Sequence, residues 1–130
     1  MNFIPIAEPS LGIEEVKLVL DCLKSTWISS TGKYIEQFES EFRDYFQARY
    51  AVSCSNGTTA LHLALLALDI KSGDEVIVPV LTFVSSANAI AYTGATPVFV
   101  DVSLDTWNID VTKIEEKINS RTKAIMVVHL

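Results

Sequence analysis

The sequence predicts an α/β fold in which a mainly parallel β-sheet carries helices on both faces. Apolar segments of strand length alternate with segments whose apolar residues recur every three or four positions. Strands that alternate with helical crossovers pair in parallel, and a continuous apolar strand such as residues 75–79 is typical of a sheet covered on both faces. The chain has 130 residues, which is enough for one domain with a substantial core.

The composition argues against several function classes. The net charge is −6 and no lysine or arginine cluster could neutralise a row of phosphates, so nucleic-acid binding is not expected. No apolar run approaches the ~20 residues of a membrane span and residues 1–10 do not resemble a secretion signal, so we expect no membrane contact and a cytoplasmic protein. Cys22 and Cys54 show neither a disulfide framework nor metal-ligand spacing, and no metal site is expected.

Residues 1–48 are predicted to form an extended arm followed by two helices. Residues 2–11 contain two prolines and no periodicity, which is typical of an arm. Helical spacing of apolar residues then predicts helices over 13–23 and 33–47. The second helix carries an aromatic stripe that we expect to pack in the core, formed by Tyr34, Phe38, Phe42, Tyr45 and Phe46.

The loop between these helices combines a large aromatic residue, Trp27, with several small hydroxyl residues. Such a loop suits ligand contact, because functional residues concentrate on loops held by a rigid scaffold. In the alternative interpretation, the loop is a surface turn and Trp27 fills part of the core.

Residues 49–130 are predicted to supply strands and their crossover helices. Four strands are expected at residues 50–54, 75–79, 97–102 and 122–128. Helices are expected to begin near Gly57, near Thr82 and after Asp110, which would cap a helix through Ile118.

The turn near Gly57 is a candidate phosphate site. The first turn of a helix leaves backbone N–H groups unpaired, glycine lets a ligand approach the backbone, and Thr58 and Thr59 add hydroxyl donors. In the alternative interpretation the turn is an ordinary helix start, with Ser55 or Asn56 as its cap.

Other polar or aromatic residues are predicted at the same edge of the sheet. Residues 81–83, Asp101 and His129 each follow a predicted strand, and parallel sheets bind ligands at the carboxyl ends of their strands. These observations favour a phosphate-bearing ligand. No G-x-G-x-x-G or G-K-[ST] pattern follows any strand, so the ligand would be held in a different way from a nucleotide in those motifs.

Four segments carry a specific resemblance when they are taken together and in order. They are residues 27–33 (WISSTGK), 55–62 (SNGTTALH), 79–89 (PVLTFVSSANA) and 97–102 (PVFVDV). In this order they resemble the amino-terminal part of the DegT/StrS family, which comprises pyridoxal-phosphate-dependent sugar-nucleotide aminotransferases. The resemblance implies the amino-terminal part of the large domain of an aspartate-aminotransferase-type, fold type I enzyme. One departure is Thr26, where the family pattern leads us to expect glycine.

The resemblance implies roles for individual residues in binding the cofactor, pyridoxal 5'-phosphate. Asn56, Gly57, Thr58 and Thr59 would hold its phosphate, in agreement with the interpretation of this turn from the residues alone. Phe83 would lie flat against its pyridine ring. The alternative for Phe83 is an ordinary core phenylalanine.

The resemblance also implies a substrate. The sugar nucleotide would meet the first loop through Trp27, Ser29, Ser30 and Thr31. The implied reaction is amination of GDP-4-keto-6-deoxymannose at carbon 4, with glutamate as amino donor, by a homodimer that serves polysaccharide biosynthesis.

The residues that carry the chemistry are expected elsewhere. The resemblance implies a Schiff-base lysine and an acid beside the pyridine nitrogen, both beyond Leu130, so no catalytic residue is assigned to this chain. We therefore expect an amino-terminal fragment that is inactive alone. The alternative is a non-catalytic α/β module that binds a phosphorylated ligand or pairs with a complete subunit.

Overall fold

The computed structural model describes residues 3–5 and 7–129, and the chain forms two compact units, Met1–Ser53 and Cys54–Leu130. The arm predicted for residues 2–11 includes residues 2 and 6, which lie outside the described residues. Its described residues belong to neither a helix nor a strand, as predicted for an arm.

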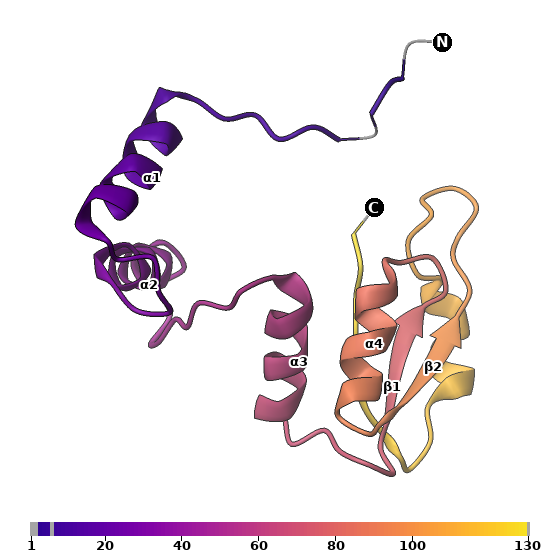
Figure 1. Cartoon of the computed structure of the whole chain (residues 1–130). Coiled ribbons are helices and arrows are strands. Elements are labelled where there is room, and N and C mark those ends of the chain that lie inside the picture. Colours follow the sequence, from indigo (N-terminus) through magenta and orange to yellow (C-terminus); the bar gives the residue numbers. More distant parts are fainter. Residues whose placement is uncertain (1–2, 6, 130) are drawn as a thin grey trace. The chain divides into compact units, whose positions relative to one another are not determined.

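The first unit contains two helices, α1 (Ile13–Ser25) and α2 (Lys33–Tyr45), which are joined by the loop of residues 26–32 (Figure 1). The N–H of Gly12 donates to the Glu15 carboxylate at 2.7 Å. This acid in the first turn also faces the positive end of the helix dipole. Both helices lie within two residues of their predicted bounds.

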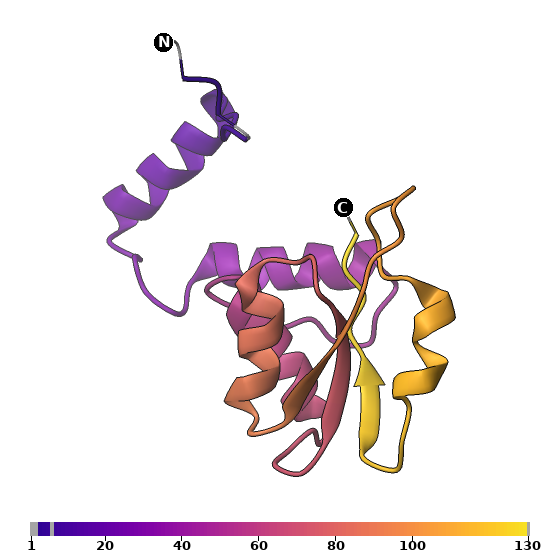
Figure 2. The ribbon, with the colours of Figure 1, turned by 90° about the vertical axis from the view of Figure 1, so that its right-hand side faces the viewer.

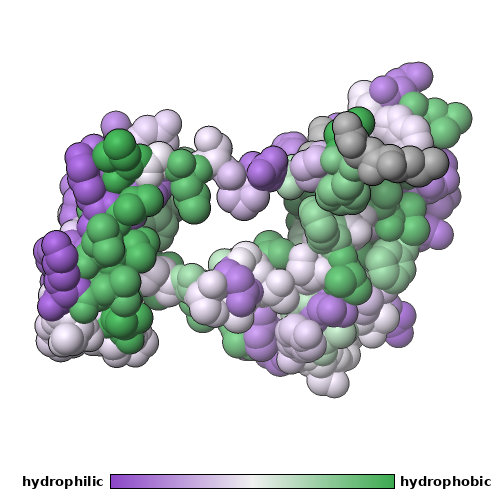
Figure 3. Space-filling model, turned by 45° about the horizontal axis from the view of Figure 1, so that its top comes forward, coloured by the Kyte–Doolittle hydropathy of each residue, from purple (hydrophilic) through white to green (hydrophobic). Residues whose placement is uncertain are grey.

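The aromatic stripe of α2 is not part of a core, and that prediction is wrong for this chain. Phe42 remains 47% exposed, and neither α1 nor α2 contains a buried residue. Figure 3 shows hydrophobic side chains gathered on the surface of this unit. The rings of Phe38, Phe42 and Phe46 pack on one another along the helix, with successive centroids 5.7 and 4.6 Å apart. The physical reason is that two helices form a single layer, which cannot enclose an apolar stripe.

The second unit is a parallel sheet with helical crossovers (Figure 2). Its elements are α3 (Gly57–Ala67), β1 (Glu75–Pro79), α4 (Val84–Tyr92), β2 (Thr96–Val100), the 3-10 turns η1 (Val111–Lys113) and η2 (Glu115–Lys117), and β3 (Thr122–Ile125). The strand order is β2-β1-β3, and Ile77 of β1 lies opposite Val98 and Ile125 in the two parallel ladders. No helix in the described part of the chain is long and apolar enough to cross a membrane.

The core lies on both faces of the central strand β1, all of whose residues are buried. On one face, Val76 and Val78 pack with residues of α3 and α4, including Leu65 and Ile90. On the other face, Ile77 packs with Val100 and Ile109. Two covered faces explain why β1 is continuously apolar, as the sequence predicted.

The strand predicted at residues 50–54 is not formed in the described structure. A strand needs a neighbour for its backbone groups. Both edges of β1 are taken by β2 and β3, and residues 50–54 pair with none of the described strands. The predicted fourth strand is therefore the third one observed, β3, and it ends at Ile125 rather than at residue 128.

The helix predicted from Asp110 through Ile118 is replaced by η1 and η2. Asp110 caps this segment as predicted, because its carboxylate accepts the Thr112 N–H at 3.0 Å. Val111, Thr112 and Ile114 are β-branched, and such residues lose side-chain freedom in an α-helix. The local sequence thus starts a helical turn but does not sustain a helix.

Glu75 joins the amino ends of β1 and β3. It is only 7% exposed, and its carboxylate accepts hydrogen bonds from Asn119 Nδ2 at 2.7 Å and Arg121 Nε at 2.8 Å. The hydrogen bond from Asn119, together with the Arg121 guanidinium, holds the pKa of Glu75 below its ordinary value of 4.5, although burial acts in the opposite direction. A charged carboxylate in β1 therefore holds the segment that immediately precedes β3.

We predict that this carboxylate stabilises the fold in a pH-dependent way. Because its pKa is lower in the folded state, its contribution is present above about pH 4.5 and is lost as the pH falls through the folded pKa. Glu75→Gln should therefore lower the free energy of unfolding at pH 7, and the difference from the parent should shrink below pH 4.5. Denaturant unfolding of the whole protein and of the variant, from pH 7 to pH 3, measures this difference in the free energy of unfolding.

Glu116→Gln is the matched control, since Glu116 is exposed and its one ion pair among the described residues is with Lys117 at 3.5 Å. A constant difference between Glu75→Gln and parent from pH 7 to pH 3 would contradict the prediction.

Candidate functional site

The amino end of α3 is shaped by a reciprocal pair of caps. Asn56 Oδ1 accepts the Thr59 N–H at 3.0 Å, while Thr59 Oγ1 accepts the Asn56 N–H at 3.3 Å and donates to the Asn56 carbonyl at 2.8 Å. Asn56, rather than Ser55, is thus the cap residue. The side chains of Asn56 and Thr59 are engaged in holding the turn.

The residues between these two caps offer free donors. In the described structure, the N–H groups of Gly57 and Thr58 and the Thr58 hydroxyl have no hydrogen-bond partner. A Cβ placed on Gly57 would meet no atom within 4 Å, and Gly57 is not among the residues with positive φ. Neither a steric contact nor the backbone conformation therefore requires glycine at this position, and the backbone N–H groups beside it are open to approach. Two N–H groups and a hydroxyl at the positive end of a helix fit a phosphate.

Phe83 lies in the turn between β1 and α4 and is 84% exposed. Phe83 is therefore not part of a core formed by the described residues. The helices α3 and α4 pack on each other, and both begin at the end of the unit where β1 ends (Figure 1). The turn at Gly57 and the Phe83 ring therefore belong to the same edge of the sheet, where parallel sheets bind ligands.

Asp101 supports the end of β2. Its carboxylate accepts the Val102 N–H at 2.9 Å and pairs with Lys113 Nζ at 3.2 Å. The Val102 N–H, and then Lys113, lower the pKa of Asp101. Within the described ranges, no group of three His, Cys, Asp or Glu side chains is arranged to hold a metal ion.

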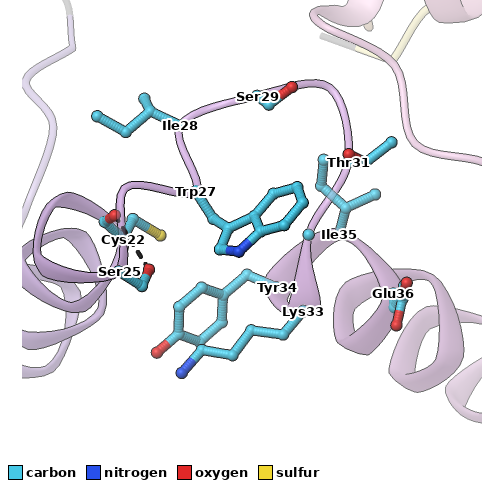
Figure 4. Close-up of a pocket in the computed structure, with 11 residues that line it drawn as sticks. Cys22, Ser25, Trp27, Ile28, Ser29, Thr31, Lys33, Tyr34, Ile35 and Glu36 are labelled. Carbon is cyan, nitrogen blue, oxygen red and sulfur yellow. Dashed lines mark hydrogen bonds between the residues drawn. The ribbon is translucent and has the colours of Figure 1, made fainter.

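The first unit contains a pocket of about 760 Å³ formed around the loop of residues 26–32 (Figure 4). Trp27, Ser29 and Thr31 line it, whereas Ser30 does not. The Trp27 indole lies at the centre of this group of side chains, near Tyr34, and is 61% exposed. Trp27 therefore does not fill a core, and its ring is accessible to a ligand.

A charged cluster underlies one side of this pocket. Asp21 of α1 pairs with Lys33 Nζ at 2.5 Å and accepts a hydrogen bond from the Tyr34 hydroxyl at 2.9 Å. The Lys33 contact, and then that of Tyr34, lower the pKa of Asp21, and the same contact with Asp21 raises the pKa of Lys33. Asp21 thus fixes a lysine and a tyrosine that line the pocket.

The loop departs from ordinary backbone conformation at both of its ends. Thr26 caps α1 in the left-handed region with φ 64°, and Gly32 precedes α2 with φ 140°. Glycine adopts such angles without steric cost. The position where the family pattern has glycine and this chain has Thr26 is therefore one that physically favours glycine.

The two groups of predicted site residues lie in different units. Asn56 to Thr59 and Phe83 belong to the second unit, while Trp27, Ser29, Ser30 and Thr31 belong to the first. Asp21 was not predicted as a site residue from the sequence. The resemblance implied that Ser86 packs and supports the helix after Phe83, and Ser86 is indeed buried and hydrogen-bonded to Thr82 in the turn that contains Phe83. No sequence signal marks Asp21, since its partner Tyr34 is 13 residues away.

The comparisons with known proteins place the chain in a family. Residues 9–130 match the model of the DegT/DnrJ/EryC1/StrS aminotransferase family, and the chain belongs to this family. It is 58% identical to GDP-perosamine synthase of Escherichia coli O157:H7 over 130 residues. This match includes the whole chain but only 36% of the relative, so the chain spans about a third of the length of the curated relatives it matches.

Solved structures of aminotransferase-type proteins share the fold. An aminotransferase from Psychrobacter cryohalolentis is 42% identical with a TM-score of 0.86, over 97% of this chain and 32% of that one. An E. coli GDP-4-keto-6-deoxy-D-mannose-3-dehydratase with bound hydrated pyridoxal phosphate is 33% identical with a TM-score of 0.84, over 97% of this chain and 34% of that one. These likenesses confirm the predicted fold class, the amino-terminal part of a fold type I large domain.

The free donors at the start of α3 yield a prediction that separates ligand binding from helix capping. If they hold a phosphate, Thr58→Ala should weaken pyridoxal phosphate binding by about one to two orders of magnitude, because a charge-assisted hydrogen bond contributes roughly 1.5 to 3 kcal/mol. Gly57→Val should weaken binding further, since its side chain would occupy the approach to the N–H groups. Titration of the whole protein, followed by cofactor absorbance, measures both effects.

Thermal melts of the cofactor-free variants provide the control. Space is open at Gly57, so Gly57→Val should change the melting temperature little. Unchanged affinity in both variants, with shifted melts alone, would show that the turn is only a helix cap.

Proposed function

We propose that the protein containing this chain is a pyridoxal-phosphate-dependent aminotransferase that acts on a keto-sugar nucleotide. The observation that carries the proposal is the pair of free N–H groups at Gly57 and Thr58, at the same sheet edge as the exposed Phe83 ring, in a chain of this family. The relative with bound hydrated pyridoxal phosphate supports the choice of cofactor.

Each residue of the α3 turn has a distinct part in holding the cofactor. Gly57 and Thr58 donate to the phosphate, while Asn56 and Thr59 keep the turn in the conformation that exposes those donors. Phe83 offers a flat apolar surface to the pyridine ring. The bound cofactor supplies an electron sink that allows an amino group to move between carbon atoms.

The first unit contributes substrate contacts in this proposal. Trp27 offers a ring for stacking, and the hydroxyls of Ser29 and Thr31 offer hydrogen bonds to the polar groups of a sugar nucleotide. Ser30 belongs to the same loop but does not line the pocket, so its proposed contact would be made from outside the pocket. Lys33 lines the same pocket as a cation, held by Asp21. A pocket of about 760 Å³ that is lined by two aromatic side chains, Trp27 and Tyr34, and by several hydroxyls suits a ligand of this class.

The substrate is proposed from the similarity to GDP-perosamine synthases. It is GDP-4-keto-6-deoxymannose, aminated at carbon 4 with glutamate as donor, in a cytoplasmic homodimer that serves polysaccharide synthesis. Residues 1–48 are the arm and helices, and residues 49–130 begin the cofactor-binding large domain. The lysine that binds the cofactor covalently and the acid at its ring nitrogen lie in the rest of the protein.

The test is amino transfer by the whole protein. With ¹⁵N-glutamate and GDP-4-keto-6-deoxymannose, mass spectrometry should detect an aminated GDP sugar that contains the label. The 130-residue chain alone should form none, because the lysine is expected outside it. Loss of water without gain of nitrogen would instead indicate a reaction like that of the dehydratase relative, and would contradict the aminotransferase proposal.

A further inference from the structure

The helix α4 begins with an unusual residue. Its N-cap position is occupied by Phe83, and no side chain caps the helix there. Serine, threonine, asparagine and aspartate are preferred at this position because their oxygen accepts a free N–H of the first turn, which phenylalanine cannot do. A local rule that is broken at the edge of a candidate site indicates a functional constraint on this residue.

Ser86 hydrogen-bonds to the turn that precedes α4. It is 5% exposed, its N–H donates to the Phe83 carbonyl at 3.0 Å, and its hydroxyl lies 2.7 Å from that of Thr82. Ser86 therefore bonds Phe83 itself and the residue before it. These bonds hold the Phe83 backbone at φ −59° and ψ 141°.

The Phe83 side chain does not fix its own position. It is 84% exposed, and no ring of the described residues stacks on it. The direction of the ring therefore depends on the backbone of the turn. That backbone is held by Ser86 from the buried side.

From this arrangement we infer that Ser86 is a positioning residue, which sets the Phe83 ring in place before the cofactor binds. The inference rests on the proposed contact between Phe83 and the cofactor ring. A purely structural Ser86 would affect the stability of the second unit and not the cofactor. A positioning Ser86 affects cofactor affinity, and only while Phe83 is present.

A double-mutant cycle with the whole protein tests the inference. The variants are Ser86→Ala, Phe83→Ala and the double variant, and the readout is the dissociation constant of pyridoxal phosphate from fluorescence titration. Ser86→Ala should weaken binding by about 2- to 10-fold, the range of one hydrogen bond. In the Phe83→Ala background the same substitution should have no further effect, and Ser86→Thr should restore affinity.

Ser85→Ala is the matched control. Ser85 is the neighbouring residue of α4, and its hydroxyl has no hydrogen-bond partner in the described structure, so affinity should not change. If Ser86→Ala does not fold, Thr82→Val removes the same hydroxyl pair from the other side and should show the same dependence on Phe83. Melts of the cofactor-free variants report stability separately.

Two results would overturn the inference. The first leaves the proposed function intact, whereas the second also contradicts the proposed contact between Phe83 and the cofactor. If Phe83→Ala weakens binding but Ser86→Ala does not, or does so equally in both backgrounds, Ser86 has no positioning role and the proposed function stands. If Phe83→Ala itself leaves affinity unchanged, the proposed ring contact fails and the inference fails with it.

Discussion

Burial of β1 on both faces is the constraint on which the second unit depends. Val76 and Val78 pack against α3 and α4, while Ile77 packs on the opposite face, so the strand must lie in the middle of the sheet. Parallel neighbours on both sides then require crossovers that run back along the sheet. The crossover helix α4 consequently begins at the edge where β1 ends, and α3, which packs on α4, begins at the same edge, so the turn at Gly57 and Phe83 share this edge.

The first turns of α3 and α4, both at this edge, are held in different ways. In α3, Asn56 and Thr59 cap each other, which leaves the donors of Gly57 and Thr58 free. In α4, the cap position carries an exposed aromatic ring, and the buried Ser86 holds the turn instead. One start thus presents polar donors and the other an apolar surface. A cofactor with a phosphate and a flat ring requires both.

Features that depend on neighbouring residues could be predicted from the sequence. The apolar strand β1, the start of α3 and the cap at Asp110 each follow from patterns of a few residues. The strand expected at residues 50–54 failed because a strand depends on a distant partner. The links of Glu75 to Arg121 and of Tyr34 to Asp21 span 46 and 13 residues, so no local pattern reveals them. The turn at Gly57 and the exposed loop at Trp27 were identified as candidate sites because glycine, hydroxyl and aromatic residues concentrate there.

The central claim is that the free donors at the start of α3 bind the cofactor phosphate. An experimental structure of the whole protein with pyridoxal phosphate tests it most directly. The phosphate oxygens should lie about 2.7 to 3.2 Å from the backbone nitrogens of Gly57 and Thr58 and from the Thr58 hydroxyl. A cofactor whose phosphate is held elsewhere, with these three groups facing only solvent, would contradict the account.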